Sequence, residues 1–166
     1  MIVWILRHAK AVPDPPSGKT DHERTLAPRG RRDADALGKR LAEPGFVPVG
    51  LPELVLCSTA TRTVKTAERA LAPLEHPPPV DYRRRLYGAS TDDVLDELRG
   101  VGSDISSVMV VGHNPTAHDL VVSLDRASGP KSFPTCALAV FRLPAERWSN
   151  LDRGTGKLLG LYTPPY

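Results

Sequence analysis

The feature that most constrains the fold is a set of short, uninterrupted apolar runs spread along the chain. Residues 2–6, 54–57 and 108–111 are almost entirely aliphatic and do not alternate with polar residues. Such runs are typical of strands buried on both faces in a parallel sheet, because crossover helices cover both sides of a sheet of this kind. Each run ends abruptly at polar residues, which predicts that the strands stop at a functional edge of the sheet.

Segments with helical spacing separate these runs. Ser58 or Thr59 occupies the position expected for the N-cap of the second helix, and Ser90 that of the third. The alternation predicts an α/β fold, a three-layer α/β/α sandwich with a mostly parallel central sheet and few insertions. The expected helices are 28–41, 59–72, 91–98 and 116–124, and further strands are expected near residue 80 and at 137–143 and 158–162.

Length and composition limit the class of protein. The 166 residues predict a single domain over 1–166, and 40% hydrophobic with 25% charged residues is typical of a globular protein. A net charge of +3 with few aromatic residues suggests affinity for anions, and we expect no nucleic-acid partner. No apolar run is long enough for a membrane span or a signal peptide, and Cys57 and Cys136 are expected to be buried thiols, so we expect a cytoplasmic location. The oligomeric state is not indicated.

Residues 9–27 interrupt the regular pattern. This segment contains Pro13, Pro15, Pro16 and Gly18 and has neither helical nor strand periodicity. Loops of this length in a compact domain are usually functional, so we expect a lid-like loop.

The polar residues that follow the apolar runs form the main candidate site. Arg7 and His8 follow the first run, Arg62 follows the second near a helix start, and His113 follows the third. Ligands of open α/β sheets bind at the carboxyl ends of the strands, so His8 and His113 are expected to face each other if their strands are neighbours. Two imidazoles beside two guanidinium groups favour a bound anion, and arginine donates to phosphate in bidentate fashion.

Three interpretations of this set remain open. His8 can act as a nucleophile on phosphorus, with Arg7 and Arg62 on the equatorial oxygens and His113 stabilising the developing charge. A metal site is the second, but cysteine or carboxylate ligands are missing at suitable spacing and the arginines would repel a cation, so no metal or other cofactor is expected. In the third, both histidines are ordinary strand-end residues satisfied by local hydrogen bonds.

The sequence also resembles the histidine phosphatase superfamily, whose fold is that of phosphoglycerate mutase, and within it the small SixA-type branch of phosphohistidine phosphatases. Three segments carry the resemblance: Leu6-Arg7-His8-Ala9-Lys10-Ala11, Ser58-Thr59-Ala60-Thr61-Arg62-Thr63 with Thr66-Ala67-Glu68, and Val111-Gly112-His113-Asn114-Pro115. Asp21-x-x-Arg24-x-Leu26 followed by Gly30, and Leu86-Tyr87, are similar to the small branch as well.

The resemblance implies that His8 is phosphorylated and that Arg7, Arg62 and His113 complete the phosphate pocket, with Arg24 as a further contact. Two features depart from the family pattern. Ala9 replaces the usual glycine after the histidine, which matters little if its φ is negative. The glutamate that donates a proton in larger members has no counterpart in residues 83–87.

These observations lead to an expected function. We expect a metal-independent phosphatase acting on phosphohistidine in proteins, with Asp21, Asp14 or Glu23 as possible proton donors. One alternative is a phosphomonoesterase acting on a small phosphorylated metabolite or nucleotide, and another is a non-catalytic phosphate-binding or scaffolding domain. His22 could touch the substrate or be a solvated loop residue.

Overall fold

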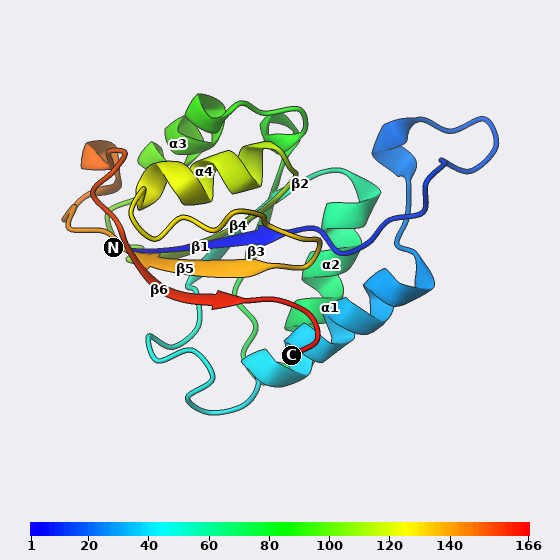
Figure 1. The fold of residues 1–166 in the computed structure, drawn as a ribbon, viewed down its shortest axis with the longest axis horizontal. Helices are drawn as coiled ribbons and strands as arrows, with labels where there is room; N and C mark the ends of the chain where they lie inside the picture. Colours follow the sequence, from blue (N-terminus) through cyan, green and yellow to red (C-terminus); the bar gives the residue numbers. More distant parts are fainter.

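The computed structural model describes residues 1–166, and its centre is a six-stranded mixed sheet (Figure 1). The strand order is β3-β2-β4-β1-β5-β6. β1, β2, β3 and β4 run parallel to one another, whereas β5 pairs antiparallel with both β1 and β6. The strands are β1 Ile2–Arg7, β2 Leu54–Ser58, β3 Val80–Arg83, β4 Ser107–Gly112, β5 Leu138–Arg142 and β6 Lys157–Tyr162.

The register of the central strands determines where the site lies. β4 sits between β1 and β2, with Arg7 opposite Gly112 and Cys57 opposite Val111. The polar residues that follow these three strands therefore meet at one edge of the sheet, as predicted.

Four helices cover the two faces of the sheet. α1 (Pro28–Leu41) and α2 (Thr61–Leu71) lie on one face, and α3 (Thr91–Arg99) and α4 (Thr116–Leu124) on the other (Figure 1). Side chains of β1 alternate between two cores, with Val3 and Ile5 in the core under α3 and α4 and Trp4 and Leu6 in the core under α1 and α2. The predicted three-layer α/β fold is confirmed. None of the helices combines the length and apolar character needed to cross a bilayer.

The N-cap of α2 differs from the prediction. Ala60, not Ser58 or Thr59, occupies that position and provides no side-chain cap. The two hydroxyl groups bond elsewhere, Ser58 with His113 and Thr59 with His22. The prediction for α3 is confirmed, because Ser90 caps that helix in a reciprocal pair with Asp93.

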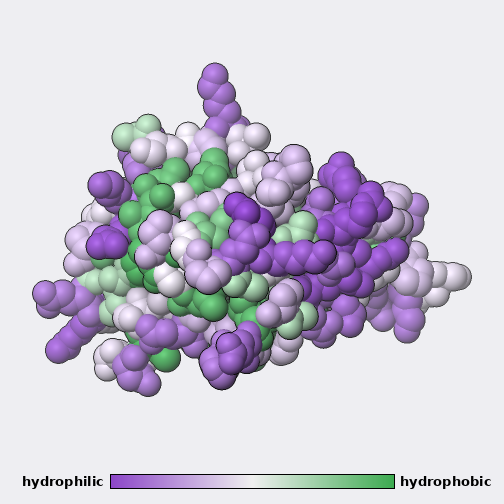
Figure 2. Space-filling model, turned by 90° about the horizontal axis from the view of Figure 1, so that it is seen from below, coloured by the Kyte–Doolittle hydropathy of each residue, from purple (hydrophilic) through white to green (hydrophobic).

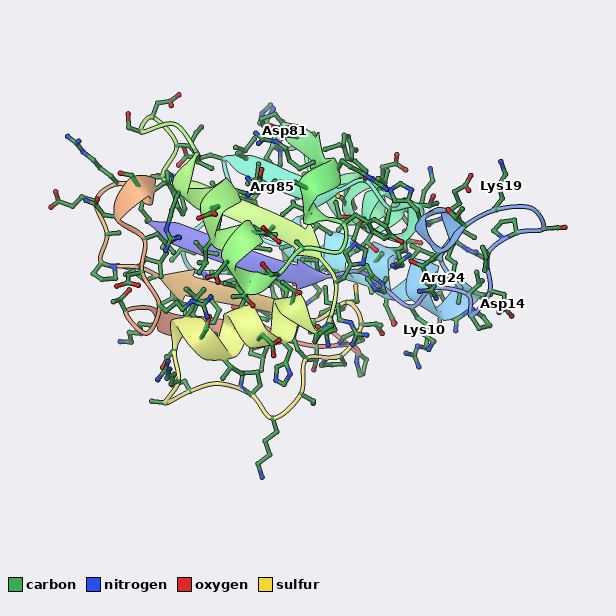
Figure 3. The ribbon with its side chains drawn as sticks, turned by 90° about the horizontal axis from the view of Figure 1, so that it is seen from above. Lys10, Asp14, Lys19, Arg24, Asp81 and Arg85 are labelled. Atoms are coloured by element: carbon green, nitrogen blue, oxygen red, sulfur yellow. The ribbon has the colours of Figure 1, made fainter.

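The loop between β1 and α1 extends away from the end of the sheet (Figures 1 and 3). A single bridge between Ala11 and Leu26 closes its base, and a 3₁₀ helix, Asp21–Glu23, folds back toward α2. The base lies tightly against α1, since a Cβ added to Gly30 would lie 2.0 Å from the carbonyl oxygen of Lys10. The end of the molecule that carries this loop is covered mainly by hydrophilic residues (Figure 2).

Candidate active site

His8 lies directly after β1 and is almost fully buried, with 8% of its surface exposed. Its Nδ1 lies 2.8 Å from the carbonyl oxygen of Ala9. A carbonyl only accepts hydrogen bonds, so Nδ1 carries the proton and the neutral ring has its free electron pair on Nε2. The backbone around this residue is fixed from two sides, because the His8 N–H donates to Gly112 and the Ala9 N–H donates to the hydroxyl of Thr66.

His113 lies after β4, next to His8. The two ring centroids are 5.3 Å apart, as expected for residues that follow neighbouring strands. His113 Nε2 bonds to the hydroxyl of Ser58 at 2.8 Å, whereas its buried Nδ1 has no partner within the protein. One nitrogen of this ring is thus available to a ligand.

Two arginines lie beside the histidines, and each holds a buried Nε–H without a partner. Arg7 Nη1 donates to the carbonyl oxygen of Phe133 at 2.9 Å, an oxygen that Asn114 Nδ2 also binds. Arg62, which is 6% exposed, donates from Nη1 to the backbone oxygen of Asp21. Arg40 Nε, outside this site, also has no partner, so the unpartnered atoms alone do not define a site. Two guanidinium groups with such donors beside two histidines are suited to binding an anion.

The Asp21 carboxylate ties the loop to the site. It accepts hydrogen bonds from the hydroxyl of Tyr87 at 2.7 Å, from Arg24 Nε at 2.8 Å and from Arg62 Nη2 at 3.1 Å. The Tyr87 hydroxyl, followed by the two arginines, holds the pKa of Asp21 well below its usual range. Asp21 is therefore an ionised anchor for these side chains.

Burial keeps both histidines neutral. Desolvation is the largest cause that lowers the pKa of His8 from 6.5 to about 4, and the positive charges of Arg62 and Arg7 act in the same direction. Desolvation, followed by the charge of His8, lowers the pKa of His113 to about 3. Both imidazoles are uncharged at neutral pH, which suits a nucleophile.

The other candidate residues of the loop lie at different distances from the site. Arg24 is half-buried near the base, and its Nη1 donates to the carbonyl oxygen of Val12. Its charge also contributes to the lowered pKa of His8, so it lies within electrostatic reach of that ring. Glu23 bonds to the backbone N–H of Thr20, and Asp14 is exposed far out on the loop (Figure 3).

Sequence reasoning gave Tyr87 no role in the site and left the role of His22 open. Tyr87 bonds to Asp21, and its ring lies 5.7 Å from that of His113 and 4.7 Å from that of His22. His22 is half-buried and bonds to Thr59, so it is not a solvated loop residue. The sequence signal for Tyr87 is weak, because it follows a short 3₁₀ helix, Arg84–Leu86, and reaches the site only through the fold.

Two further predictions from the sequence concern the backbone of Ala9 and the thiols of the two cysteines. Ala9 does not have a positive φ, so its replacement of glycine causes no backbone strain. Cys57 and Cys136 are buried and free, as predicted, and burial raises the pKa of each thiol to about 12. No group of three or more His, Cys, Asp or Glu side chains is arranged as metal ligands.

Comparison with known proteins identifies the family. A model of the histidine phosphatase superfamily, branch 1, matches residues 3–94. An uncharacterised protein of Mycobacterium tuberculosis is 38% identical over 170 residues, which cover 96% of this chain and 99% of the relative. The chain belongs to the histidine phosphatase superfamily.

Solved structures place this histidine phosphatase superfamily member near the SixA-type branch. A candidate phosphohistidine phosphatase SixA from Nakamurella multipartitia has a TM-score of 0.82 and 31% identity, covering 99% of this chain and 96% of the other. The protein histidine phosphatase SixA complexed with tungstate has a TM-score of 0.78 and 26% identity, covering 99% and 97%. The expected family and branch are confirmed.

Proposed function

We propose that this protein is a phosphatase that forms a covalent phosphohistidine at His8, and that its main substrate is phosphohistidine in proteins. One observation carries the proposal: a buried neutral imidazole with its free electron pair on Nε2 lies beside the unpartnered Nε–H groups of Arg7 and Arg62. A nucleophile and anion donors in this arrangement suit attack on a phosphoryl group.

In the first step, the lone pair of His8 Nε2 attacks phosphorus and the bond from phosphorus to the leaving nitrogen breaks. The leaving imidazole keeps that electron pair and takes a proton from solvent. Arg7 and Arg62 bind the equatorial oxygens while His8 Nδ1–H stays on the Ala9 carbonyl. If the hydroxyl of Ser58 donates to Nε2 of His113, then Nδ1–H of His113 donates to a phosphoryl oxygen.

In the second step, water attacks the phosphorus of phosphorylated His8. The bond between phosphorus and Nε2 breaks, its electrons return to the ring, and the proton of water leaves to solvent. Inorganic phosphate departs, and the neutral imidazole is regenerated for the next cycle.

The preferred class of substrate follows from the lack of a proton donor held in place for the leaving group. Asp21 is held ionised by Tyr87 and two arginines, Asp14 is exposed far out on the loop, and Glu23 is occupied by the backbone N–H of Thr20 and by Lys19. A phosphohistidine needs little help, because an imidazole with a pKa near 6.5 is protonated by solvent. An alkoxide leaving group needs an acid, which is typically worth about 10²- to 10⁴-fold in rate. The likeness to a SixA named as a protein histidine phosphatase supports the same substrate.

The decisive experiment is phosphoryl labelling of the protein. A phosphorylated substrate should label wild-type protein with an acid-labile, alkali-stable group that vanishes in His8→Ala and persists in His118→Ala, whose ring bonds to Pro130 away from the site. Labelling that survives in His8→Ala would overturn the nucleophile.

A substrate panel distinguishes the alternatives. Phosphohistidine should be turned over best, aryl phosphates less well, and sugar phosphates and nucleotides at least about 10²-fold more slowly. Better turnover of a metabolite would favour a phosphomonoesterase. Binding of phosphate with no turnover of any compound would favour a scaffolding domain.

Metal independence is part of the same proposal. Activity should survive exhaustive chelation, because arginines rather than metal ligands surround the phosphate position. Vanadate or tungstate should inhibit by occupying that position, as supported by the SixA relative complexed with tungstate. Loss of activity to a chelator with recovery on adding zinc would contradict this.

A further inference from the structure

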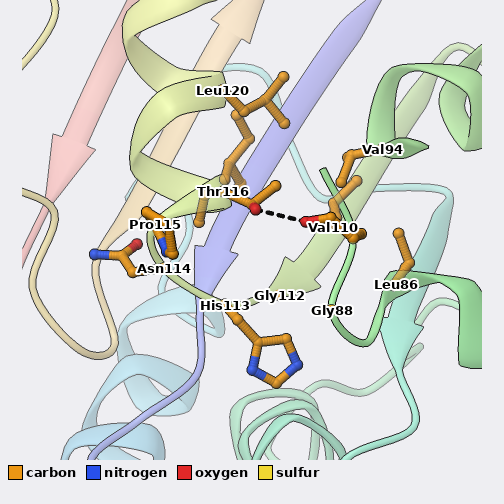
Figure 4. Close-up of a pocket in the computed structure, with 13 residues that line it drawn as sticks. Leu86, Gly88, Val94, Val110, Gly112, His113, Asn114, Pro115, Thr116 and Leu120 are labelled. Atoms are coloured by element: carbon orange, nitrogen blue, oxygen red, sulfur yellow. Dashed lines mark hydrogen bonds between the residues drawn. The ribbon is translucent and has the colours of Figure 1, made fainter. Parts of the chain in front are cut away.

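A pocket of about 280 Å³ lies under α3 and α4 (Figure 4). His113 separates this pocket from α1 and α2. It opens between the segment after β4 and the turn before α3. Its volume is at the lower end of the range for small-molecule sites, about 300–1,000 Å³, so it suits one side chain better than a large ligand. The lining includes Leu86, Ala89, Val94, Thr116, Ala117 and Leu120.

The chemistry of the wall selects an apolar occupant. No Asp, Glu, Lys or Arg lines the pocket. The hydroxyl of Thr116 already donates to the carbonyl oxygen of Ala89 at 2.6 Å, and the Asn114 amide donates to Phe133. The two unpartnered polar atoms of the lining, His113 Nδ1 and Asn114 Oδ1, belong to the segment next to the proposed phosphate site. Among Leu86, Val94 and Leu120, a charged or strongly polar group would lose its hydration without gaining partners, whereas an aliphatic group would gain from burial.

The pocket and the proposed phosphate site meet at His113, which lines the pocket and whose ring centroid lies 5.3 Å from that of His8. Figure 4 shows the imidazole of His113 at one end and the side chains of Val94 and Leu120 at the other. Gly112 also lines the pocket, and its carbonyl oxygen binds the N–H of His8. A substrate with phosphorus at His8 can therefore place a neighbouring group in the pocket.

We infer that this pocket is a specificity site for an aliphatic side chain of the substrate protein, on a residue close in sequence to the phosphohistidine. The inference rests on the proposed function and adds what that function leaves open, namely how one phosphohistidine protein is preferred over another. Free phosphohistidine has no group that fills the pocket, so preference appears only with peptides.

Phosphohistidine peptides test the inference. In a peptide with alanine at the two positions on each side of phosphohistidine, one alanine at a time is replaced by leucine or by aspartate. At one position, leucine should raise kcat/KM by about 10- to 200-fold over alanine, the usual worth of filling an apolar pocket. Aspartate at that position should lower it.

Variants of the pocket residues show whether the preference for leucine arises in this pocket. Ala117→Leu fills the pocket and should bring the ratio of kcat/KM for the leucine and alanine peptides close to one. Val122→Leu, on the exposed face of α4, is the matched control and should keep the wild-type ratio. Because Ala117→Leu can disturb packing, Val94→Ala provides a second readout: it enlarges the pocket and should shift preference from leucine toward phenylalanine.

The outcomes separate the two proposals. If free phosphohistidine is hydrolysed but leucine has no effect at any of the four positions, the pocket assignment is wrong and the proposed function stands. If the leucine preference persists in Ala117→Leu and does not shift in Val94→Ala, the preference arises elsewhere and the assignment is again wrong. If no phosphohistidine compound is hydrolysed, while an aryl phosphate is, both fail and the pocket belongs to a small-molecule site.

Discussion

At the scale of single residues, the site depends on buried polar groups that have no hydrogen-bond partner within the protein. Arg7 donates to the protein from Nη1 and Arg62 from both Nη1 and Nη2, which leaves the buried Nε–H of each without a partner. The hydrogen bond of His8 to Ala9 fixes the tautomer that an attack through Nε2 requires. Each residue is thus oriented before any substrate binds, which is the condition for electrostatic stabilisation of a transition state.

Arg62 offers the most direct test at this scale. Arg62→Ala removes one oriented donor and should lower kcat for phosphohistidine by about 10²- to 10³-fold. The variant should remain folded by circular dichroism. Arg69→Ala is a matched control on the same helix, since Arg69 pairs with Asp35 on the surface. A loss below about threefold for Arg62→Ala would show that Arg62 does not contact the phosphoryl group.

A substitution of Asp21 distinguishes two roles: an anchor that positions neighbouring side chains, and a general acid that protonates the leaving group. Asp21→Asn keeps the shape of the side chain but removes its negative charge and its ability to transfer a proton. If Asp21 only positions Arg62 and Tyr87, turnover of phosphohistidine and of an alkyl phosphate should fall by the same factor. A general acid would instead give a loss confined to the alkyl phosphate, by about 10²-fold or more.

The residues near the site differ in how far the sequence predicts them. Arg7, His8 and His113 closely follow apolar runs, and Arg62 lies in the first turn of the helix after the second run, so their meeting at one edge follows once the strand order is known. The hydrogen-bond partners of Ser58 and Thr59 cannot be predicted from the sequence. A hydroxyl residue between a strand and a helix is usually the N-cap of that helix, so the sequence favours capping over a bond to a histidine. Tyr87 contacts Asp21 across 66 residues, and no local pattern encodes such a contact.

At the scale of elements, the packing of the loop base against α1 determines the position of His8. Gly30 lies in the first turn of α1, and the backbone of Lys10 passes so close that no Cβ fits. The N–H of Ala27 donates to the carbonyl oxygen of Lys10 at 2.8 Å, which fixes the same contact. The helix therefore supports the segment that follows His8, the proposed nucleophile. The sequence predicts α1 and the loop, but it does not predict this close contact.

Gly30→Ala should consequently affect both stability and activity. The added methyl group displaces the Lys10 backbone and should cost about 1–3 kcal/mol in free energy of unfolding, as for other overpacked sites. Gly100→Ala is the control, because its added Cβ would meet only ordinary contacts at 3.6 Å. Urea denaturation and kcat with phosphohistidine measure the two effects. Equal behaviour of both variants would contradict the proposed contact.

At the scale of the whole molecule, the buried neutral histidines couple stability to pH. The folded pKa of His8, about 4, lies below the unfolded value of 6.5, so the unfolded chain binds more protons between these values. Stability from this source is complete above pH 6.5 and is lost as the pH falls toward 4. His113 contributes in the same direction.

Acidification should therefore destabilise the free protein. Between pH 7.5 and pH 5.0, each of the two histidines should remove about 2 kcal/mol from the free energy of unfolding. Urea denaturation at the two pH values measures the summed loss of unfolding free energy. His8→Gln should reduce the pH dependence by about one such increment, and an unchanged dependence would show that His8 is not neutral in the folded protein.

The strand order has a consequence for the synthesis of the protein. β1 emerges first from the ribosome, yet both of its neighbours, β4 and β5, follow residue 106. β1 and β2 do not pair with each other, because β4 lies between them. A nascent chain that ends at residue 100 therefore carries His8 and Arg62 but cannot bring them together in a sheet. The candidate site therefore forms only when β4 inserts between β1 and β2, and chains that end before β4 are expected to be inactive.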